Sequence, residues 1–264
     1  MNTTSSTALR SRIRMAAIGV PLALALAACG GSDDADGAAA GTIAQGEVAE
    51  AVAAPEGSQW IDVVSRTETG GWLMGNPDAP IKLIEYGSLT CGACAAFTAE
   101  GAEPLKSDYV NTGRVSFELR SMPLHGAIDL VLTRMLECAP VEAGPALADQ
   151  VWLNLPEVYG GFQQNMEGAQ QALTLAPEER LVQFAERTGF LDFFAARGIG
   201  KDAARTCLAD ADAAENLANT LQSAAEADNI NKTPTFLING TQVEASRWSE
   251  LEPLLQRAGA RSGE

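Results

Sequence analysis

The sequence predicts an α/β domain with a central mixed sheet, built from a β-α-β unit, an all-helical insertion and a closing β-β-α unit. Two compact apolar segments, residues 81–87 and 114–120, flank one helical segment, which favours a parallel strand pair with a crossover helix. Residues from about 125 to 227 carry apolar side chains at helical spacing without a convincing strand pattern. Residues 233–240 return to a strand pattern, and an amphipathic helix follows them.

The first half of the domain opens with a predicted hairpin. Residues 60–66 alternate as "WIDVVSR", "TETGG" supplies a turn, and "WLMG" returns as a second strand. After the apolar strand 81–87, Thr90 is a suitable cap for a helix that begins at Cys91 and continues to about Asn111. Pro104 is expected to kink or divide that helix. Residues 114–120, "RVSFELR", form the next strand.

The second half follows the helical insertion. "TPTFLING" is a strand with a glycine turn, and "TQVEA" can pair back as a short antiparallel strand. The insertion and the last helix are marked by apolar residues at helical spacing, among them Ile128, Val131, Leu132, Met135, Leu136, Leu217, Leu221, Trp248, Leu251 and Leu255.

The N-terminus carries the features of a secretory signal. Arg10, Arg12 and Arg14 precede the apolar run 15–28, which is shorter than the roughly 20 residues needed to span a bilayer. The run ends "LAAC", which resembles a bacterial lipobox, in which the cysteine is lipidated and becomes the mature N-terminus. We therefore expect a lipoprotein signal peptide at residues 1–28 and lipidation at Cys29. The alternative is an ordinary signal peptide that ends near a cysteine.

A flexible acidic tether is predicted between the signal and the domain. Residues 29–59 are rich in Gly, Ala, Asp and Glu and almost lack large apolar side chains, so they cannot bury enough surface to become ordered. The folded domain then spans residues 60–264. The formal net charge of −16 disfavours binding to nucleic acid or anionic lipid headgroups, because both require clustered cations.

Three motifs carry a resemblance to a known family. "GNPDAP" precedes the buried strand, "IEYGSLTCGACAAF" joins that strand to its helix, and "TPTFLING" opens the closing hairpin. In this order around a helical block, they resemble the DsbA-like branch of the thioredoxin superfamily, over residues 60–264. The resemblance implies a thioredoxin fold with a helical insertion and a thiol:disulfide oxidoreductase activity.

Cys91 and Cys94 have the spacing of a redox pair. A cysteine at a helix N-terminus is favoured as the thiolate, because unpaired backbone N–H groups and the helix dipole stabilise the anion. Cys94 lies one helical turn later on the same face, and the intervening Gly92 and Ala93 are small and uncharged. We assign Cys91 as the exposed nucleophile and Cys94 as the more buried resolving thiol. The alternative, an inert staple across one helical turn, would constrain almost nothing.

No metal or organic cofactor is expected. A tetrahedral zinc site requires four Cys or His ligands, usually in paired spacings. The chain has one histidine, His125, and the cysteines outside the pair are isolated in the sequence. A histidine at a helix start is typical of a surface or capping residue, although a place at the rim of the active site is the alternative.

The resemblance assigns roles to three further residues. Glu85 matches a buried acid that relays a proton to or from the resolving thiol; the alternative is that Glu85 points outward and pairs with Lys82. Thr233 and Pro234 match a cis peptide that faces the cysteine pair, where the Thr233 backbone offers hydrogen bonds to an extended substrate. A trans proline at the start of a strand is the alternative.

Cys138 and Cys207 fall within the predicted insertion, each beside core-like residues. Together they complete an even number of cysteines in an oxidising compartment, which favours a structural disulfide. The alternative is two separate buried thiols, since a free cysteine packs as a small apolar side chain.

We therefore expect an envelope-anchored thiol:disulfide oxidoreductase, facing the periplasm, that acts on cysteine-containing envelope proteins as an oxidase. Its expected redox partner is a membrane enzyme of the DsbB or vitamin-K-reductase type, and Gly30 after Cys29 favours the outer membrane by analogy with enteric sorting. Oxidant DsbA proteins commonly carry Pro-His between the cysteines, whereas this chain carries Gly92 and Ala93. A reductase or isomerase, or a peptide-binding lipoprotein with secondary redox activity, are the alternatives.

Overall fold

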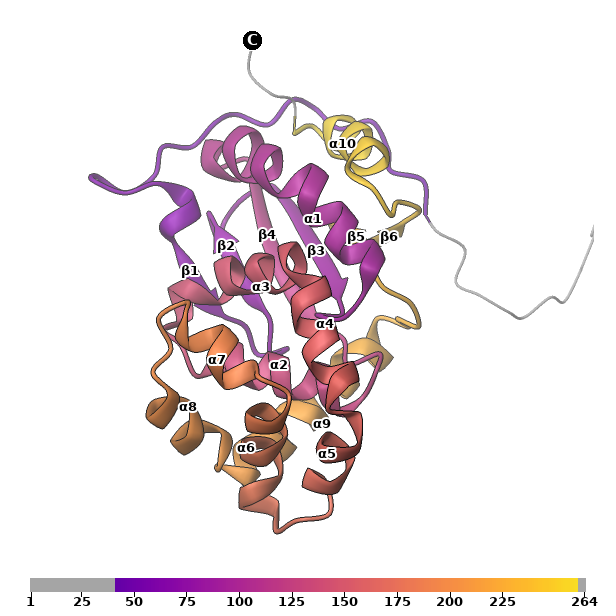
Figure 1. The fold of residues 1–264 in the computed structure, drawn as a ribbon. Helices are drawn as coiled ribbons and strands as arrows, with labels where there is room; N and C mark the ends of the chain where they lie inside the picture. The colour runs from indigo at the N-terminus through magenta and orange to yellow at the C-terminus, as the bar shows by residue number, and fades with distance from the viewer. Residues whose placement is uncertain (1–40, 261–264) are drawn as a thin grey trace, which may run out of the picture. The chain divides into compact units, whose positions relative to one another are not determined.

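The computed structural model of the protein describes residues 41–260. Its six-stranded sheet has the order β1-β2-β4-β3-β5-β6 (Figure 1). The strands are β1 (Val64–Arg66), β2 (Trp72–Gly75), β3 (Ile81–Gly87), β4 (Val115–Ser121), β5 (Thr235–Ile238) and β6 (Thr241–Val243). The predicted signal segment 1–28 and Cys29 lie outside the described residues.

β3 occupies a central position in the sheet. It pairs in parallel with β4 and antiparallel with β5, and α1 (Gly92–Pro104) connects β3 to β4. A parallel pair requires such a crossover, whereas β5 and β6 are joined by a tight turn and followed by α10 (Trp248–Arg257). This connectivity is that of a thioredoxin fold with a mixed sheet, so the predicted fold class is confirmed.

The helical insertion lies between β4 and β5. Its helices are α2 (Ala127–Glu137), α3 (Gly144–Leu153), α4 (Leu155–Gln164), α5 (Met166–Ala172), α6 (Pro177–Arg187), α7 (Phe190–Ala195), α8 (Lys201–Leu208) and α9 (Ala211–Ala227). Figure 1 shows α5, α6 and α8 gathered away from the sheet, whereas α3 lies close to α1. Between residues 41 and 260, no helix combines the length and the apolar composition that crossing a membrane requires.

The first predicted strand is shorter than expected. Residues Trp60–Asp62 form a 3-10 helix, and β1 begins only at Val64. Trp60 is buried, and its indole Nε1 donates a hydrogen bond to the carbonyl oxygen of Val52 at 2.7 Å. The packing of this indole outweighs the alternating pattern that predicts a strand from residue 60.

Residues 41–52 differ from the expected flexible tether, because they run along the folded domain. The backbone N–H groups of Gly41, Gly46 and Ala49 donate to the carbonyl oxygens of Gln242 on β6, Arg257 and Gly259, respectively, at 2.8–3.0 Å. Ile43 is the one buried residue between positions 41 and 59. Backbone hydrogen bonds hold this segment against the domain. Because such bonds do not depend on side-chain type, the polar composition of the segment did not reveal its contact with the domain.

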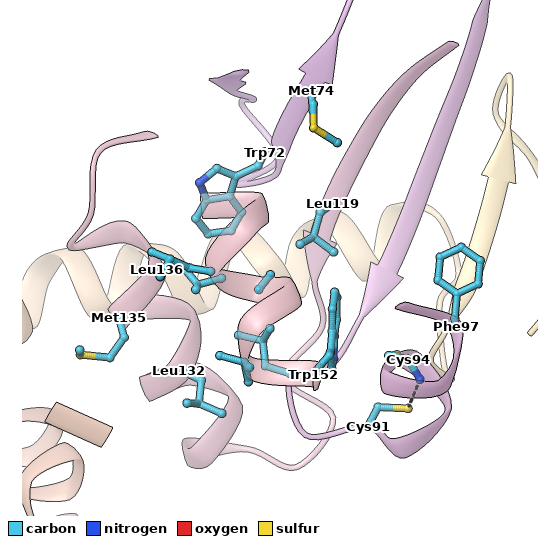
Figure 2. Packing of buried hydrophobic residues seen from close by; sticks show 14 of the residues in the cluster. Trp72, Met74, Cys91, Cys94, Phe97, Leu119, Leu132, Met135, Leu136 and Trp152 are labelled. Atoms are coloured by element: carbon cyan, nitrogen blue, oxygen red, sulfur yellow. Dashed lines mark hydrogen bonds between the residues drawn. The ribbon is translucent and has the colours of Figure 1, made fainter. Parts of the chain in front are cut away.

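The helix α1 is fixed to the sheet by aromatic packing. The Phe97 ring lies 4.6 Å from that of Phe236 on β5 and 6.4 Å from that of Trp248 on α10, measured between ring centroids. Figure 2 shows Phe97 on the helix that carries Cys94, and Cys91 lies at the start of that helix. At its C-terminal end, Pro104 is followed by a π-helical turn, Leu105–Tyr109, as expected where a proline removes a backbone donor.

A disulfide joins two helices of the insertion. The sulfur atoms of Cys138, after α2, and Cys207, on α8, are bonded at 2.10 Å, and the two Cα atoms are 5.7 Å apart. Of the two alternatives for these cysteines, the structure has the disulfide. It links residues that are 69 positions apart, so it restricts a long loop of the unfolded chain.

Replacing both Cys138 and Cys207 with serine is expected to lower the free energy of unfolding by about 2–4 kcal/mol, because a disulfide that closes a long loop constrains the unfolded state. Urea unfolding of both proteins, followed by circular dichroism, measures the difference. The alkylation rate of Cys91 at neutral pH is the control and should not change. An unchanged unfolding free energy would contradict a stabilising disulfide.

Candidate active site

Cys91 occupies the N-cap of α1, immediately after β3 and its short connecting loop. Its sulfur accepts a hydrogen bond from the backbone N–H of Cys94 at 3.5 Å, which Figure 2 marks as a dashed line. Both thiols are free. Cys91 is 9% exposed and Cys94 is completely buried, so the order of exposure is the expected one, although Cys91 is less open than an exposed nucleophile.

The surroundings of Cys91 stabilise its thiolate. A hydrogen bond from the Cys94 thiol is the largest influence and lowers the pKa of Cys91 to about 5, against the opposing effect of burial. The backbone N–H groups of Cys94 and Ala93 lower the pKa further. Hydrogen bonds to the charged form favour that form, so Cys91 is the thiolate at neutral pH.

Cys94 has the opposite tendency. Burial raises the pKa of the Cys94 thiol, and the hydrogen bond that it donates to Cys91 and the negative charges of Glu85 and Cys91 raise it further. At neutral pH the pair therefore consists of one thiolate and one thiol. This division provides an attacking sulfur at Cys91 and a protonated second sulfur at Cys94.

Glu85 points into the protein from β3 and is 1% exposed. Burial raises the pKa of Glu85 to about 8, and the charges of Asp149 and Cys91 contribute to the rise. Its Oε1 has no hydrogen-bond partner in the described protein. Lys82 is exposed and donates from Nζ to the carbonyl oxygen of Pro77, so it does not pair with Glu85.

The Thr233–Pro234 peptide bond is cis and lies beside Cys91. The Cys91 sulfur is 3.4 Å from the carbonyl oxygen of Thr233, which accepts the hydrogen bond when the thiol is protonated. The segment enters β5, and β5 pairs with β3. Glu85 lies on β3, Cys91 follows β3, and Thr233 precedes β5. The pairing of β3 with β5 therefore brings these three residues together.

A buried polar network behind Cys91 was not predicted. The side chain of Asp129 on α2 is buried and accepts hydrogen bonds from the hydroxyls of Ser88 and Thr90 and from the backbone N–H of His125. Thr90 Oγ1 also lies 2.7 Å from Nδ1 of His125. Thr90 was expected to cap α1, but Cys91 is the cap, and the Thr90 hydroxyl joins this network.

A signal for this network was present in the sequence. Asp129 is an acid within an otherwise apolar helical stripe, and it follows His125 by one helical turn. His125 is half-exposed and lies beside the residue that precedes Cys91, which agrees with a place at the rim of the site.

Trp152 was also not singled out by the sequence. Its indole Nε1 donates to the carbonyl oxygen of Ser88 at 2.9 Å, and its ring packs against Gly87. A Cβ atom at Gly87 would meet the ring at 2.9 Å, so glycine permits this close approach. The side chain from α3 thus holds the loop between β3 and α1.

Comparisons with known proteins agree with this geometry. A family model described as thioredoxin matches residues 67–257. Disulfide bond formation protein D of Bacillus subtilis is 22% identical over 94 residues, which make up 36% of this chain and 37% of that protein. The chain spans about two-fifths of the length of the curated relatives that it matches.

Two solved structures are also similar. A protein-disulfide isomerase from Novosphingobium aromaticivorans superposes with a TM-score of 0.65 at 26% identity, covering 73% of this chain and 98% of that one. The alpha-DsbA1 of Wolbachia pipientis gives a TM-score of 0.57 at 20% identity, covering 71% and 89%, and its likeness concerns the fold.

The low pKa of Cys91 can be tested by titration. Absorbance at 240 nm of the reduced protein should rise with a midpoint at about pH 5. In Cys94→Ala the midpoint should move up by about one pH unit or more, because the thiolate loses its principal hydrogen-bond donor. The Cys138→Ser/Cys207→Ser variant is the control and should titrate like the wild type. An equal midpoint in Cys94→Ala would contradict this origin of the shift.

The raised pKa of Glu85 predicts how stability depends on pH. A carboxyl whose folded pKa is above its unfolded value destabilises the fold as pH rises from about 4.5 toward about 8. Glu85→Gln should therefore match the wild type below pH 4 and be more stable by roughly 3–5 kcal/mol above pH 8. Urea unfolding across this pH range measures the difference. A constant difference at all pH values would show that Glu85 is not the titrating group.

Proposed function

This chain belongs to the thioredoxin family, and we propose that it is a DsbA-type thiol:disulfide oxidoreductase that acts on cysteine-containing proteins through Cys91 and Cys94. One observation carries the proposal: a stabilised thiolate at the N-cap of α1, hydrogen-bonded by the thiol that follows one turn later. A structural disulfide would not need this asymmetry, whereas thiol–disulfide exchange requires a good attacking and leaving sulfur together with a resolving thiol.

The reaction follows from the two sulfurs. In the oxidised protein, a substrate thiolate attacks the Cys91 sulfur, a substrate–Cys91 disulfide forms, and Cys94 leaves as a thiolate. Because the pKa of Cys94 is raised, Cys94 takes up a proton. A second substrate thiolate then attacks the substrate sulfur of the mixed disulfide. This attack releases Cys91 as its stable thiolate and leaves a disulfide in the substrate.

Oxidation is the proposed direction of the reaction. A low pKa at Cys91 stabilises the reduced protein, which makes its disulfide a stronger oxidant. Gly92 and Ala93 provide no charged donor for the thiolate. The Cys94 thiol and two backbone N–H groups provide the stabilisation instead. This arrangement supports an oxidising role despite the absence of a histidine between the cysteines.

Substrate binding is proposed along the segment that ends at Thr233 and Pro234. The Thr233 carbonyl oxygen lies 3.4 Å from the Cys91 sulfur, so a substrate cysteine bonded to Cys91 would lie beside this backbone. An extended substrate can use backbone hydrogen bonds there, which suits an enzyme that acts on many sequences. Glu85 is the proposed donor and acceptor of the Cys94 proton.

The proposed location is the bacterial envelope, facing the periplasm. Cys29 is the proposed lipidated anchor, and the outer membrane is the favoured membrane for that anchor. The Cys138–Cys207 disulfide supports an oxidising compartment, since such bonds are rare in the cytosol. An oxidase must also be reoxidised, and we propose a membrane enzyme of the DsbB or vitamin-K-reductase type as the electron acceptor.

Isomerase activity is the second candidate. The Novosphingobium aromaticivorans relative, of which this chain covers 98%, bears the name protein-disulfide isomerase. An isomerase works from the reduced state, whereas an oxidase delivers its disulfide, so the reduction potential separates the two. The remaining alternative is a peptide-binding lipoprotein with secondary redox activity. It differs from both enzymes because its function would not require Cys91.

The reduction potential of the Cys91–Cys94 pair, measured at equilibrium with glutathione, is expected to lie near the oxidising value of about −120 mV. A potential near that of thioredoxin, about −270 mV, would contradict the oxidase assignment. The activity control is Cys91→Ser, tested with a reduced, unfolded model protein. Complete loss of disulfide formation is expected in this variant, and retained function would contradict the enzymatic role.

A further inference from the structure

The loops that follow β3 and β4 meet beside the reactive cysteine. The two strands are parallel, and their paired register ends with Gly87 opposite Ser121. Because the strands run in the same direction, both loops emerge at the same edge of the sheet. The first loop leads to Thr90 and Cys91, and the second leads to His125 and α2. The loops are in contact there, with 2.7 Å between Thr90 Oγ1 and His125 Nδ1.

The hydrogen bonds of Asp129 fix which nitrogen of the His125 ring carries a hydrogen. A carboxylate offers acceptors only, so the Thr90 hydroxyl donates its single hydrogen to Asp129 Oδ1, at 2.8 Å. The Thr90 oxygen must then be the acceptor in its contact with His125, and Nδ1 is the donor. In the neutral ring, the lone pair that can accept a proton therefore lies on Nε2.

The His125 ring is accessible from the surface. Its side chain is 50% exposed, whereas that of Asp129, which faces Nδ1 from α2, is 1% exposed. Within residues 41–260, Nε2 makes no hydrogen bond. Thr90 and Cys91 are adjacent, so the contact between Thr90 and the ring places Nδ1 within about 9 Å of the Cys91 Cα atom. A substrate sulfur that approaches Cys91 would therefore lie near the ring.

A substrate thiol must lose its proton in order to attack a disulfide. An ordinary cysteine thiol has a pKa of about 8.5, so only about 3% of it is the thiolate at pH 7. In the oxidised protein, the sulfurs of Cys91 and Cys94 are bonded to each other and cannot take that proton. Glu85 is 1% exposed, so a substrate at the surface does not reach it. A base at the rim of the site would supply the missing thiolate.

We propose that His125 is a catalytic base for the substrate thiol, and that its Nε2 takes the proton from the substrate sulfur as that sulfur attacks Cys91. The inference rests on the proposed function. The S–H bond breaks, the substrate–Cys91 bond forms, and the Cys91–Cys94 bond breaks with its electron pair on Cys94. The imidazolium then releases its proton to solvent and can serve the second substrate thiol. Asp129 and Thr90 are positioning residues, because they orient the ring without touching the substrate.

The charged groups around the ring suit this role. Asp129 Oδ2 lies 3.7 Å from His125 Nδ1, so its negative charge stabilises the imidazolium that forms. Cys91, at the start of α1, carries no charge while it is part of the disulfide. Glu226 on α9 lines the same pocket as the residue that follows His125. Lys232, in the loop before β5, belongs to an exposed ion pair, which balances its charge.

The test is the pH dependence of this attack, measured with the oxidised full-length protein and an unstructured peptide that has two cysteines. Acid quenching and alkylation give the rate constant for loss of the Cys91–Cys94 disulfide. His125→Gln keeps a polar side chain but cannot take the proton. Its rate constant should be about tenfold lower than that of the wild type at pH 7. The two should agree within about twofold at pH 9.5, where the peptide is already a thiolate.

Two controls separate a base from a structural role. 4-Nitrothiophenol is an acidic thiol that is already a thiolate at pH 7, so it should reduce the wild type and His125→Gln at rates within about twofold. Leu124→Gln changes the exposed neighbour in the same loop and should keep the wild-type pH profile.

A wild-type rate for His125→Gln at pH 7 would overturn the proposal, and so would an equal slowing at pH 7 and pH 9.5 or with both thiols. The measurement follows the attack of a thiol on the Cys91–Cys94 disulfide and does not depend on the reduction potential. If that potential excludes an oxidase while the pH profile changes as expected, the proposed direction fails and the role of His125 stands.

Discussion

The pairing of β3 with β4 on one side and β5 on the other is the constraint on which the rest of the site depends. Register places Glu85 opposite Leu119 in β4 and Phe236 in β5, and the Glu85 side chain is 1% exposed. A short loop leads from β3 to Cys91 and α1, and the pairing with β5 brings Thr233 beside Cys91. The pairing of these strands therefore sets the positions of the N-terminus of α1, the buried Glu85 and the Thr233 backbone.

Burial raises the pKa of each of the three ionisable groups at the site, Glu85, Cys91 and Cys94, and hydrogen bonding makes their pKa values differ. Cys94 and Glu85 receive little compensation for burial, and each pKa rises. Cys91 is partly buried too, but its sulfur accepts hydrogen bonds from the thiol and the backbone N–H of Cys94 in the next turn of α1, so its pKa falls. One local environment thus provides a thiolate, a thiol and a neutral carboxyl side by side.

The insertion contributes to the site as well as to the size of the domain. Trp152 on α3 holds the loop before Cys91, and Asp129 on α2 organises the hydroxyls of Ser88 and Thr90. Asp149, also on α3, lines a small cavity together with Glu85, and its charge contributes to the raised pKa of Glu85. The sheet places the reacting groups, and the insertion supplies the polar contacts that surround them. The two parts are consequently a single functional unit.

The sequence by itself determined the fold class, the order of the elements and the two cysteines, because strand and helix periodicity and the position of a helix start are local properties. It left the state of Cys138 and Cys207 and the direction of Glu85 open, and it missed the contacts of residues 41–52, Asp129 and Asp149. Only the tertiary structure decided these features. Each depends on which distant segments meet, and Thr90 and Asp129, for example, are 39 positions apart. The cost of burying a charge or a hydrogen-bond donor is fixed by neighbours that a linear pattern does not specify.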